Sequence, residues 1–450
     1  MRATPHIEPQ LPADLVVGTA TASWQVEGDV AGRGRSIWDD FAEVPGAIVD
    51  GTTGEPACDH LRRFDEDLTL LADLGFDAYR FSVSWPRVQP TGRGEFRQEG
   101  LDVYDRMVDR LLDKGIAPII TLYHWDLPSE LPGWGSRETA ERFAAYAGTV
   151  AERLGDRVSR WATLNEPWVA AYLGYASGIH APGARDPGLA ISAAYHLMLA
   201  HGLGMRALRA AGARDPGIVL NLIPVYAEDA ASAPAARFID GLHNRFFLDL
   251  LAGRGIPRDV REATGGFCDW GFVRDADLAA MAEPLDWLGE NYYSVMRVAR
   301  AESPGPGLEA YPGCPSAAFV PREPPTAMGW EVHPAGLVDA LHMASTALPG
   351  VPLWVTENGA AYDDDVIAGA VRDSERVDYF REHIRSLLQA RESGIDVRGY
   401  LAWSLLDNIE WAEGFTKRFG IVRVDPKTLD RAPKESALWW KARLAERLSP

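Results

Sequence analysis

The sequence predicts an α/β protein, a single (β/α)8 barrel of the TIM type with long loops after its strands. Eight short apolar segments alternate with longer helical segments along the 450 residues, and this alternation is typical of parallel sheets. The short segments are apolar runs rather than strict polar–apolar alternations, which suits strands that are buried on both faces. Eight units fit a closed ring, and such a barrel can exceed about 400 residues as one domain. We therefore predict one catalytic domain over residues 1–450.

The first half of the chain supplies four predicted strands. Two of the helix-like runs between them end at a glycine, Gly75 and Gly115, the residue that most often follows the C-terminus of a helix. The predicted strands are Leu15–Thr19, Ala78–Val83, Ala117–Leu122 and Trp161–Leu164, and the predicted helices are Phe64–Leu74, Gly100–Lys114 and Arg137–Leu154.

The second half repeats the alternation. A Pro-, Gly-, Ser- and Glu-rich segment, Ala301–Pro325, interrupts it and is predicted to be a long surface loop. The predicted strands are Ile218–Ile223, Asp286–Asn291, Leu353–Thr356 and Val397–Trp403, and the predicted helices are Leu189–Ala211 and Ser374–Ser393.

A doubly wound open sheet is the competing fold, and it usually carries a glycine-rich phosphate turn after a strand. The nearest match is the segment from Gly202 to Ala207, which lies inside a helical run with no strand before it. Its glycines therefore indicate close helix packing rather than a nucleotide site.

Charge and composition exclude several function classes. Lys and Arg number 45 against 64 Asp and Glu, a net charge of −19, so we expect no nucleic-acid partner and no anionic membrane partner. The three cysteines form no CxxC pattern, and no HxH or HExxH spacing involves His124 or His180, so we expect no metal and no cofactor. The start of the chain does not resemble a signal peptide, which predicts a cytoplasmic protein. A homo-oligomer stays open.

Two glutamates follow predicted strands four and seven, where the chemistry of such a barrel is located. Glu166 comes just after Trp161–Leu164, and Glu357 just after Leu353–Thr356. We expect these strands to face each other across the ring. Two carboxyl groups in a barrel mouth with aromatic walls suit glycoside hydrolysis, in which one must be protonated and the other ionised.

The segments around these glutamates resemble the family 1 glycoside hydrolases, the β-glucosidase group. Thr163-Leu164-Asn165-Glu166-Pro167 is similar to the acid/base motif of that family, and Thr356-Glu357-Asn358-Gly359 to its nucleophile motif. The resemblance extends nearly end to end, from residues 18–28 to residues 419–425.

The resemblance implies a retaining β-glucosidase in which Glu357 is the nucleophile and Glu166 the acid and then the base. Arg80 and Tyr293 would lie beside Glu357 and favour its ionised form, Asn291 would belong to the same catalytic group, and the two carboxyl groups would be about 5–5.5 Å apart. The implied sugar-binding residues are Gln25, His124, Trp125, Asn165, Trp330, Trp403, Glu410, Trp411 and Phe419. Trp168 and Trp330 would line the aglycone side.

Glu410 bears on the substrate as well. The related 6-phospho-β-glycosidases carry a serine at this position and a tyrosine at that of Phe419, and they share the lysine at Lys417. A negative charge on Glu410 would repel a 6-phosphate, so unphosphorylated β-glucosides are predicted as the small carbohydrate substrate.

Other functions stay open from sequence. Within the same family these are β-galactoside or β-fucoside hydrolysis and transglycosylation. A sugar-binding barrel without catalysis is disfavoured because binding alone needs neither glutamate. A Ser-His-Asp hydrolase is disfavoured because the chain has no GxSxG elbow.

Overall fold

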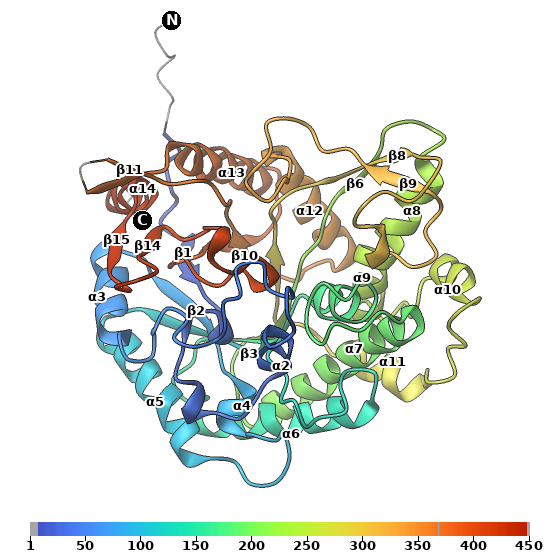
Figure 1. Ribbon diagram of the computed structural model, residues 1–450, viewed down its shortest axis with the longest axis horizontal. Coiled ribbons are helices and arrows are strands. Elements are labelled where there is room, and N and C mark those ends of the chain that lie inside the picture. The colour runs from blue at the N-terminus through green and yellow to red at the C-terminus, as the bar shows by residue number, and fades with distance from the viewer. Residues whose placement is uncertain (1–7, 368, 448–450) are drawn as a thin grey trace, which may run out of the picture.

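The computed structural model describes residues 8–367 and 369–447, and a closed ring of parallel strands lies at its centre (Figure 1). The ring order is β1-β13-β10-β7-β5-β4-β3-β2. The strands are β1 Val16–Ala20, β2 Ala78–Ser82, β3 Ala117–Tyr123, β4 Arg160–Asn165, β5 Pro216–Leu220, β7 Trp287–Asn291, β10 Leu353–Asn358 and β13 Val397–Trp403. The predicted (β/α)8 barrel is confirmed.

Helices surround the ring (Figure 1). Two of them have the predicted bounds, α3 Phe64–Leu74 and α6 Arg137–Leu154, and three more differ by at most two residues at either end, α5 Gln98–Asp113, α7 Pro187–Ala210 and α13 Ser374–Glu392. The other α-helices are α1 Ser23–Val26, α2 Ile37–Ala42, α4 Trp85–Val88, α8 Ala233–Asp240, α9 Phe246–Leu251, α10 Arg258–Thr264, α11 Asp275–Met281, α12 Pro334–Ala347 and α14 Glu435–Ala445.

A cluster of buried side chains fills the barrel, separate from the larger core between strands and helices. Each of the eight strands contributes to it: Val16, Ala78, Ile119, Ala162, Val219, Trp287, Trp354 and Leu401. The guanidinium of Arg160 lies 4.0 Å from the ring centroid of Trp354. The interior is therefore packed, as is usual for this fold, and it supports the site at the carboxyl ends of the strands.

Shorter elements lie in the loops after the strands. They are β6 Val225–Ala227, β8 Met296–Arg300, β9 Ala317–Phe319, β11 Asp365–Ile367, β12 Ala370–Arg372, β14 Val422–Val424, β15 Arg431–Pro433, the 3-10 helices η1 Val30–Gly32, η4 Leu308–Ala310 and η5 Trp411–Thr416, and the π-helices η2 Val169–Leu173 and η3 Gly241–Arg245.

The prediction for Ala301–Pro325 was wrong in part, because this segment contains η4 and β9. β9 pairs with β8, which in turn pairs with β6, so that a separate three-stranded sheet lies outside the barrel (Figure 1). A three-residue strand has too few residues to show periodicity, and its partner β8 is separated from it by a loop.

Gly202 lies in α7, as the helix-packing interpretation requires. A Cβ at this position would be 2.1 Å from the carbonyl oxygen of Ala280, so the glycine permits close approach of the α11 segment. In the described ranges, no helix has the length and apolar character needed to cross a membrane.

Candidate active site

Glu166 and Glu357 are both buried at the carboxyl ends of their strands, with 5% and 3% exposure. Glu166 directly follows β4 and has a φ of 46°, while Glu357 lies within β10, which extends two residues beyond the predicted end. Their strands are not opposite in the ring as expected, because only β5 and β7 separate them on one side. The two carboxyl groups still belong to one network of hydrogen bonds.

Arg80 links the two glutamate-bearing strands. Its Nη1 donates to Glu357 Oε1 at 2.7 Å, and its Nη2 donates to Asn165 Oδ1 at 2.7 Å. Tyr293 Oη donates to the other carboxyl oxygen of Glu357 at 2.6 Å. Both oxygens of Glu357 therefore accept a hydrogen bond, as a carboxylate held for nucleophilic attack requires.

Asn291 completes the connection to Glu166. Its Nδ2 donates to Glu166 Oε1 at 2.5 Å and to Asn165 Oδ1 at 3.0 Å. An unbroken chain of contacts thus runs from Glu357 through Arg80, Asn165 and Asn291 to Glu166, and each member is at most 5% exposed.

The two carboxyl groups hold protons differently. Burial, together with the neighbouring charge of Glu357, holds the pKa of Glu166 well above its ordinary value of 4.5. Burial also raises the pKa of Glu357, but the charge of Arg80 and the hydroxyl of Tyr293 oppose it. Glu166 therefore keeps its proton when Glu357 has lost its own, the division of roles that an acid and a nucleophile need.

Three residues assigned to sugar binding each present a buried polar atom that has no hydrogen-bond partner within the described part of the chain: Gln25 Oε1, His124 Nδ1 and Glu410 Oε2. Gln25 is held by its amide, which donates to Ile409 O at 2.7 Å and Asn408 Oδ1 at 3.1 Å. Buried polar atoms normally have partners, so these three atoms suit a polar ligand.

His124 is neutral, because burial and then the charge of Arg80 hold its pKa well below 6.5. Asn165 Nδ2 lies 3.0 Å from His124 Nε2. Asn165 Oδ1 accepts a hydrogen bond from Arg80, so Asn165 Nδ2 is the amide nitrogen and donates to His124. His124 Nε2 is then the acceptor and Nδ1 carries the proton. The unpartnered atom of His124 is thus a donor suited to a hydroxyl oxygen.

Aromatic rings enclose these polar groups. His124 stacks between Trp403 and Trp411 at centroid distances of 5.9 and 5.8 Å, and Trp411 lies 4.4 Å from Trp125. The indole nitrogen of Trp125 donates to Asn165 O at 2.9 Å. Tyr293 carries a second group, with Trp330 at 5.5 Å and Phe419 at 5.9 Å. All fourteen predicted site residues therefore lie in one neighbourhood.

Glu410 differs electrostatically from the prediction. Burial, with the charges of Glu357 and Glu413, raises the pKa of Glu410 to about 8. The carboxyl is therefore mainly neutral near pH 7 in the free protein, and the expected repulsion of a 6-phosphate is weakened there. The lysine named with Glu410 in the comparison with 6-phospho-β-glycosidases, Lys417, donates from its Nζ to Ala327 O at 2.8 Å.

Sequence reasoning missed residues that support the site without facing the sugar position. Asn408 holds Gln25 and lies beside Asp407, which forms a buried ion pair with Lys434 at 2.7 Å. Thr356 belongs to the motif that resembles the nucleophile motif, but the hydrogen bond from its hydroxyl to Asn291 was not predicted. No sequence pattern identifies these partners, because each contact joins distant segments or depends on a rotamer.

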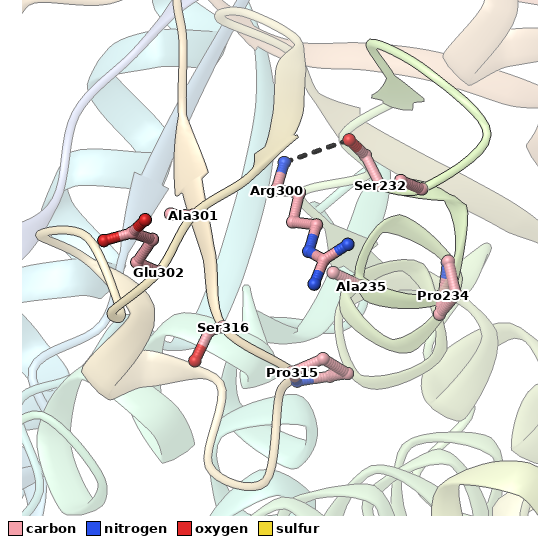
Figure 2. Close-up of a pocket in the computed structure, with 9 residues that line it drawn as sticks. Ser232, Pro234, Ala235, Arg300, Ala301, Glu302, Pro315 and Ser316 are labelled. Atoms are coloured by element: carbon pink, nitrogen blue, oxygen red, sulfur yellow. Dashed lines mark hydrogen bonds between the residues drawn. The ribbon is translucent and has the colours of Figure 1, made fainter.

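A surface hollow of about 690 Å³ lies apart from this site (Figure 2). It lies beside the start of α8, and the Arg300 side chain extends across it toward Ala235 and Pro315. None of the predicted site residues lines it. Over the described residues, no three His, Cys, Asp or Glu side chains are arranged to hold a metal ion.

Comparisons with known proteins agree with this geometry. Residues 7–447 match the model of glycosyl hydrolase family 1. A bifunctional β-D-glucosidase/β-D-fucosidase of Bifidobacterium breve is 46% identical, and the alignment covers 97% of this chain and 98% of the relative's chain. A thermostable β-glucosidase B of Thermobispora bispora is 47% identical over 96% of this chain and 89% of its own.

Solved structures give the same result. A psychrophilic β-glucosidase from Micrococcus antarcticus superposes with a TM-score of 0.93 at 42% identity, covering 98% of both chains. A β-glucosidase from Thermotoga maritima in complex with deoxynojirimycin superposes with a TM-score of 0.90 at 40% identity, covering 98% of this chain and 100% of its own.

Proposed function

The chain belongs to glycosyl hydrolase family 1, and from that premise we propose that it is a retaining, exo-acting β-glucosidase. It removes non-reducing terminal β-D-glucosyl residues from cellobiose, cello-oligosaccharides and aryl or alkyl β-glucosides. The observation that carries the proposal is the pair of buried carboxyl groups joined through Arg80, Asn165 and Asn291, beside three unpartnered polar atoms that suit sugar hydroxyls.

In the first step, Glu357 attacks the anomeric carbon while Glu166 gives its proton to the glycosidic oxygen. The bond from the anomeric carbon to that oxygen breaks, the alcohol leaves, and a glycosyl ester forms on Glu357. Tyr293 and Arg80 hold the attacking carboxylate in place. In this proposal Asn165 contacts the 2-hydroxyl, where a hydrogen bond strengthens in the transition state.

In the second step, Glu166 takes a proton from water, which attacks the same carbon and releases Glu357. Esterification removes the charge of Glu357, which is one cause of the raised pKa of Glu166. The pKa of Glu166 therefore falls once the ester has formed, and the same residue can then act as a base.

Release of the aryl group from an aryl β-D-glucoside tests the proposal. We expect activity in the wild type, a loss of several orders of magnitude in Glu357→Ala, and no change in a matched Glu392→Ala variant, which removes an exposed glutamate at the end of α13. A Glu357→Ala variant as active as the wild type would refute the mechanism.

Rescue by azide separates the two roles. With an activated aryl glucoside, azide should replace the missing carboxylate in Glu357→Ala and give the α-glucosyl azide. In Glu166→Ala, azide should attack the ester and give the β-glucosyl azide. The same azide anomer from both variants would contradict the assignment of nucleophile and acid/base.

The Bifidobacterium breve relative supports a second glycone, because its name includes β-D-fucosidase activity. We propose that β-fucosides and β-galactosides are accepted less well than β-glucosides, and that unphosphorylated β-glucosides are preferred to 6-phosphoglucosides. Comparable turnover of the 6-phosphoglucoside would overturn the last point.

Transglycosylation, in which an alcohol replaces water in the second step, would be measured by acceptor competition. The cytoplasmic location stays a prediction, and cell fractionation tests it.

A further inference from the structure

Thr356 places a hydroxyl group directly beside the catalytic network. The residue precedes Glu357 in β10 and is fully buried, with 0% exposure. Its Oγ1 donates to Asn291 Oδ1 at 2.8 Å. This is the one hydrogen bond that the amide oxygen of Asn291 receives from the described residues, and no step of the mechanism above uses the hydroxyl.

The orientation of the Asn291 amide decides what Glu166 experiences. With Oδ1 facing Thr356, Nδ2 faces Glu166 Oε1 at 2.5 Å and Asn165 Oδ1 at 3.0 Å. A donated N–H stabilises the ionised form of a carboxyl group. A rotated amide would instead direct its oxygen at Glu166 and would favour the protonated form.

The backbone around Thr356 leaves room for this hydroxyl. Gly289 lies two residues before Asn291 in β7, and a Cβ at Gly289 would be 2.8 Å from Thr356 Oγ1 and 2.9 Å from its Cγ2. Any side chain at this position would displace the threonine or Val219, whose Cγ2 would be 2.7 Å away. Gly289, Asn291 and Thr356 therefore act as one unit that joins β7 to β10.

We propose that Thr356 is a positioning residue for the reaction, whose hydroxyl holds the Asn291 amide with its N–H toward Glu166 and so favours Glu166 as the base in the second step. The inference rests on the proposed function. In the first step the proton on Glu166 makes either amide orientation tolerable. In the second step the carboxylate must accept a proton from water, and only the donating orientation supports it.

Other groups also face Glu166 and are unchanged by a substitution at Thr356. They are Glu357 from β10, Arg80 from β2, Glu410 and Tyr293 from the loops above, and Glu290 from β7. A difference in pH profile between the wild type and a Thr356 variant therefore reports the amide of Asn291.

The test compares Thr356→Val, which keeps the shape and removes the hydroxyl, with Thr356→Ser, which keeps the hydroxyl. With a dinitrophenyl β-glucoside the leaving group needs no proton, so breakdown of the glycosyl ester limits kcat. For Thr356→Val we expect kcat to fall about tenfold. We expect KM to fall with it, because the ester accumulates, so kcat/KM is nearly unchanged.

The acidic limb of the kcat profile should also move upward by about 0.5 pH unit or more in Thr356→Val, because the ionised form of Glu166 loses stabilisation. Thr356→Ser should restore both values. A matched control is Thr139→Val, which removes another fully buried hydroxyl that donates to Gly133 O, away from the site. This control should leave kcat, KM and the profile unchanged.

A Thr356→Val variant with wild-type kcat and wild-type pH profile would refute the positioning role, and so would a Thr356→Ser variant as impaired as Thr356→Val. If Thr356→Val does not fold, Thr356→Ala removes the same hydroxyl from a smaller side chain and allows the same measurements. A wild type without aryl glucosidase activity would refute the proposed function itself, so the two failures are distinguishable.

Discussion

Replacing Glu410 by glutamine should make the protein more stable at alkaline pH and leave its stability unchanged at acidic pH. Burial raises the pKa of this carboxyl from its ordinary 4.5 to about 8. Over that interval the unfolded chain has already released the proton that the folded protein still holds. The free energy of unfolding of the wild type therefore falls as pH rises from 4.5 to about 8, by the linkage between protonation and folding.

The magnitude follows from the width of the interval. Each pH unit is worth about 1.36 kcal/mol, which gives about 5 kcal/mol as an upper limit over the whole interval. The Glu410 side chain is half-buried, although its Oε2 is closed to solvent, so solvent screens part of the effect. We expect that Glu410→Gln is about 2–3 kcal/mol more stable than the wild type at pH 8.5 and nearly equal to it at pH 5.

Thermal unfolding of both proteins across pH 5–8.5 measures the difference directly, because every other titrating group is common to the two. The excess of the melting temperature of Glu410→Gln over that of the wild type should be small at pH 5, grow steadily up to about pH 8 and then level off. KM for aryl β-glucosides should rise, since one hydroxyl acceptor is lost. A difference in melting temperature that does not vary with pH would refute the reasoning.

Three further substitutions test particular contacts. Arg80→Lys removes the guanidinium that reaches Glu357 with one nitrogen and Asn165 with the other, and kcat/KM for an aryl glucoside should fall about 100-fold, with an unaltered far-UV spectrum. Lys434→Met leaves the buried carboxylate of Asp407 without its ion-pair partner, while Asp364 keeps Arg376, and this should lower the free energy of unfolding by about 3–5 kcal/mol. The exposed Lys441→Met should change it by less than about 0.5 kcal/mol. Gly359→Ala would place a Cβ 1.8 Å from a backbone oxygen of β13, so little folded protein should be recovered. Wild-type behaviour of Arg80→Lys, Lys434→Met or Gly359→Ala would contradict the contact on which that prediction depends.

The barrel could be predicted because its signals are local. A run such as Val397–Trp403 is apolar apart from Arg398 near its start, as suits a strand between the barrel interior and the helices, and it has the same bounds in the structure. The end of β10 was predicted too early because the strand continues through the polar residues Glu357 and Asn358. Glu357 faces the site, and the buried Asn358 side chain bonds to Tyr292 O and the hydroxyls of Tyr379 and Tyr400, so the apolar run stops before the strand does.

The position of the site could be predicted from the strand ends, whereas its electrostatics could not. The motif around Glu357 identifies a carboxylate, and its pairing with Arg80 is found as expected. The pKa of Glu410 depends on how tertiary contacts exclude water from one carboxyl oxygen, which no spacing in the sequence encodes. The contact of Thr356 with Asn291 likewise depends on two rotamers and on the absence of a side chain at Gly289.

Backbone strain within the site must be offset by contacts with the surrounding structure. Glu166, Trp125 and Trp411 all have positive φ, at 46°, 78° and 48°, and such a conformation costs about 1–3 kcal/mol for a residue other than glycine. Each of the three residues is anchored by a contact. The backbone N–H of Glu166 donates to Val219 O, the indole N–H of Trp125 donates to Asn165 O, and the ring of Trp411 packs on that of Trp125. The strain and the unpartnered polar atoms lie where a sugar would supply partners. A bound glucoside can offset the cost of the unpartnered atoms. When no glucoside is bound, the barrel alone must offset the backbone strain.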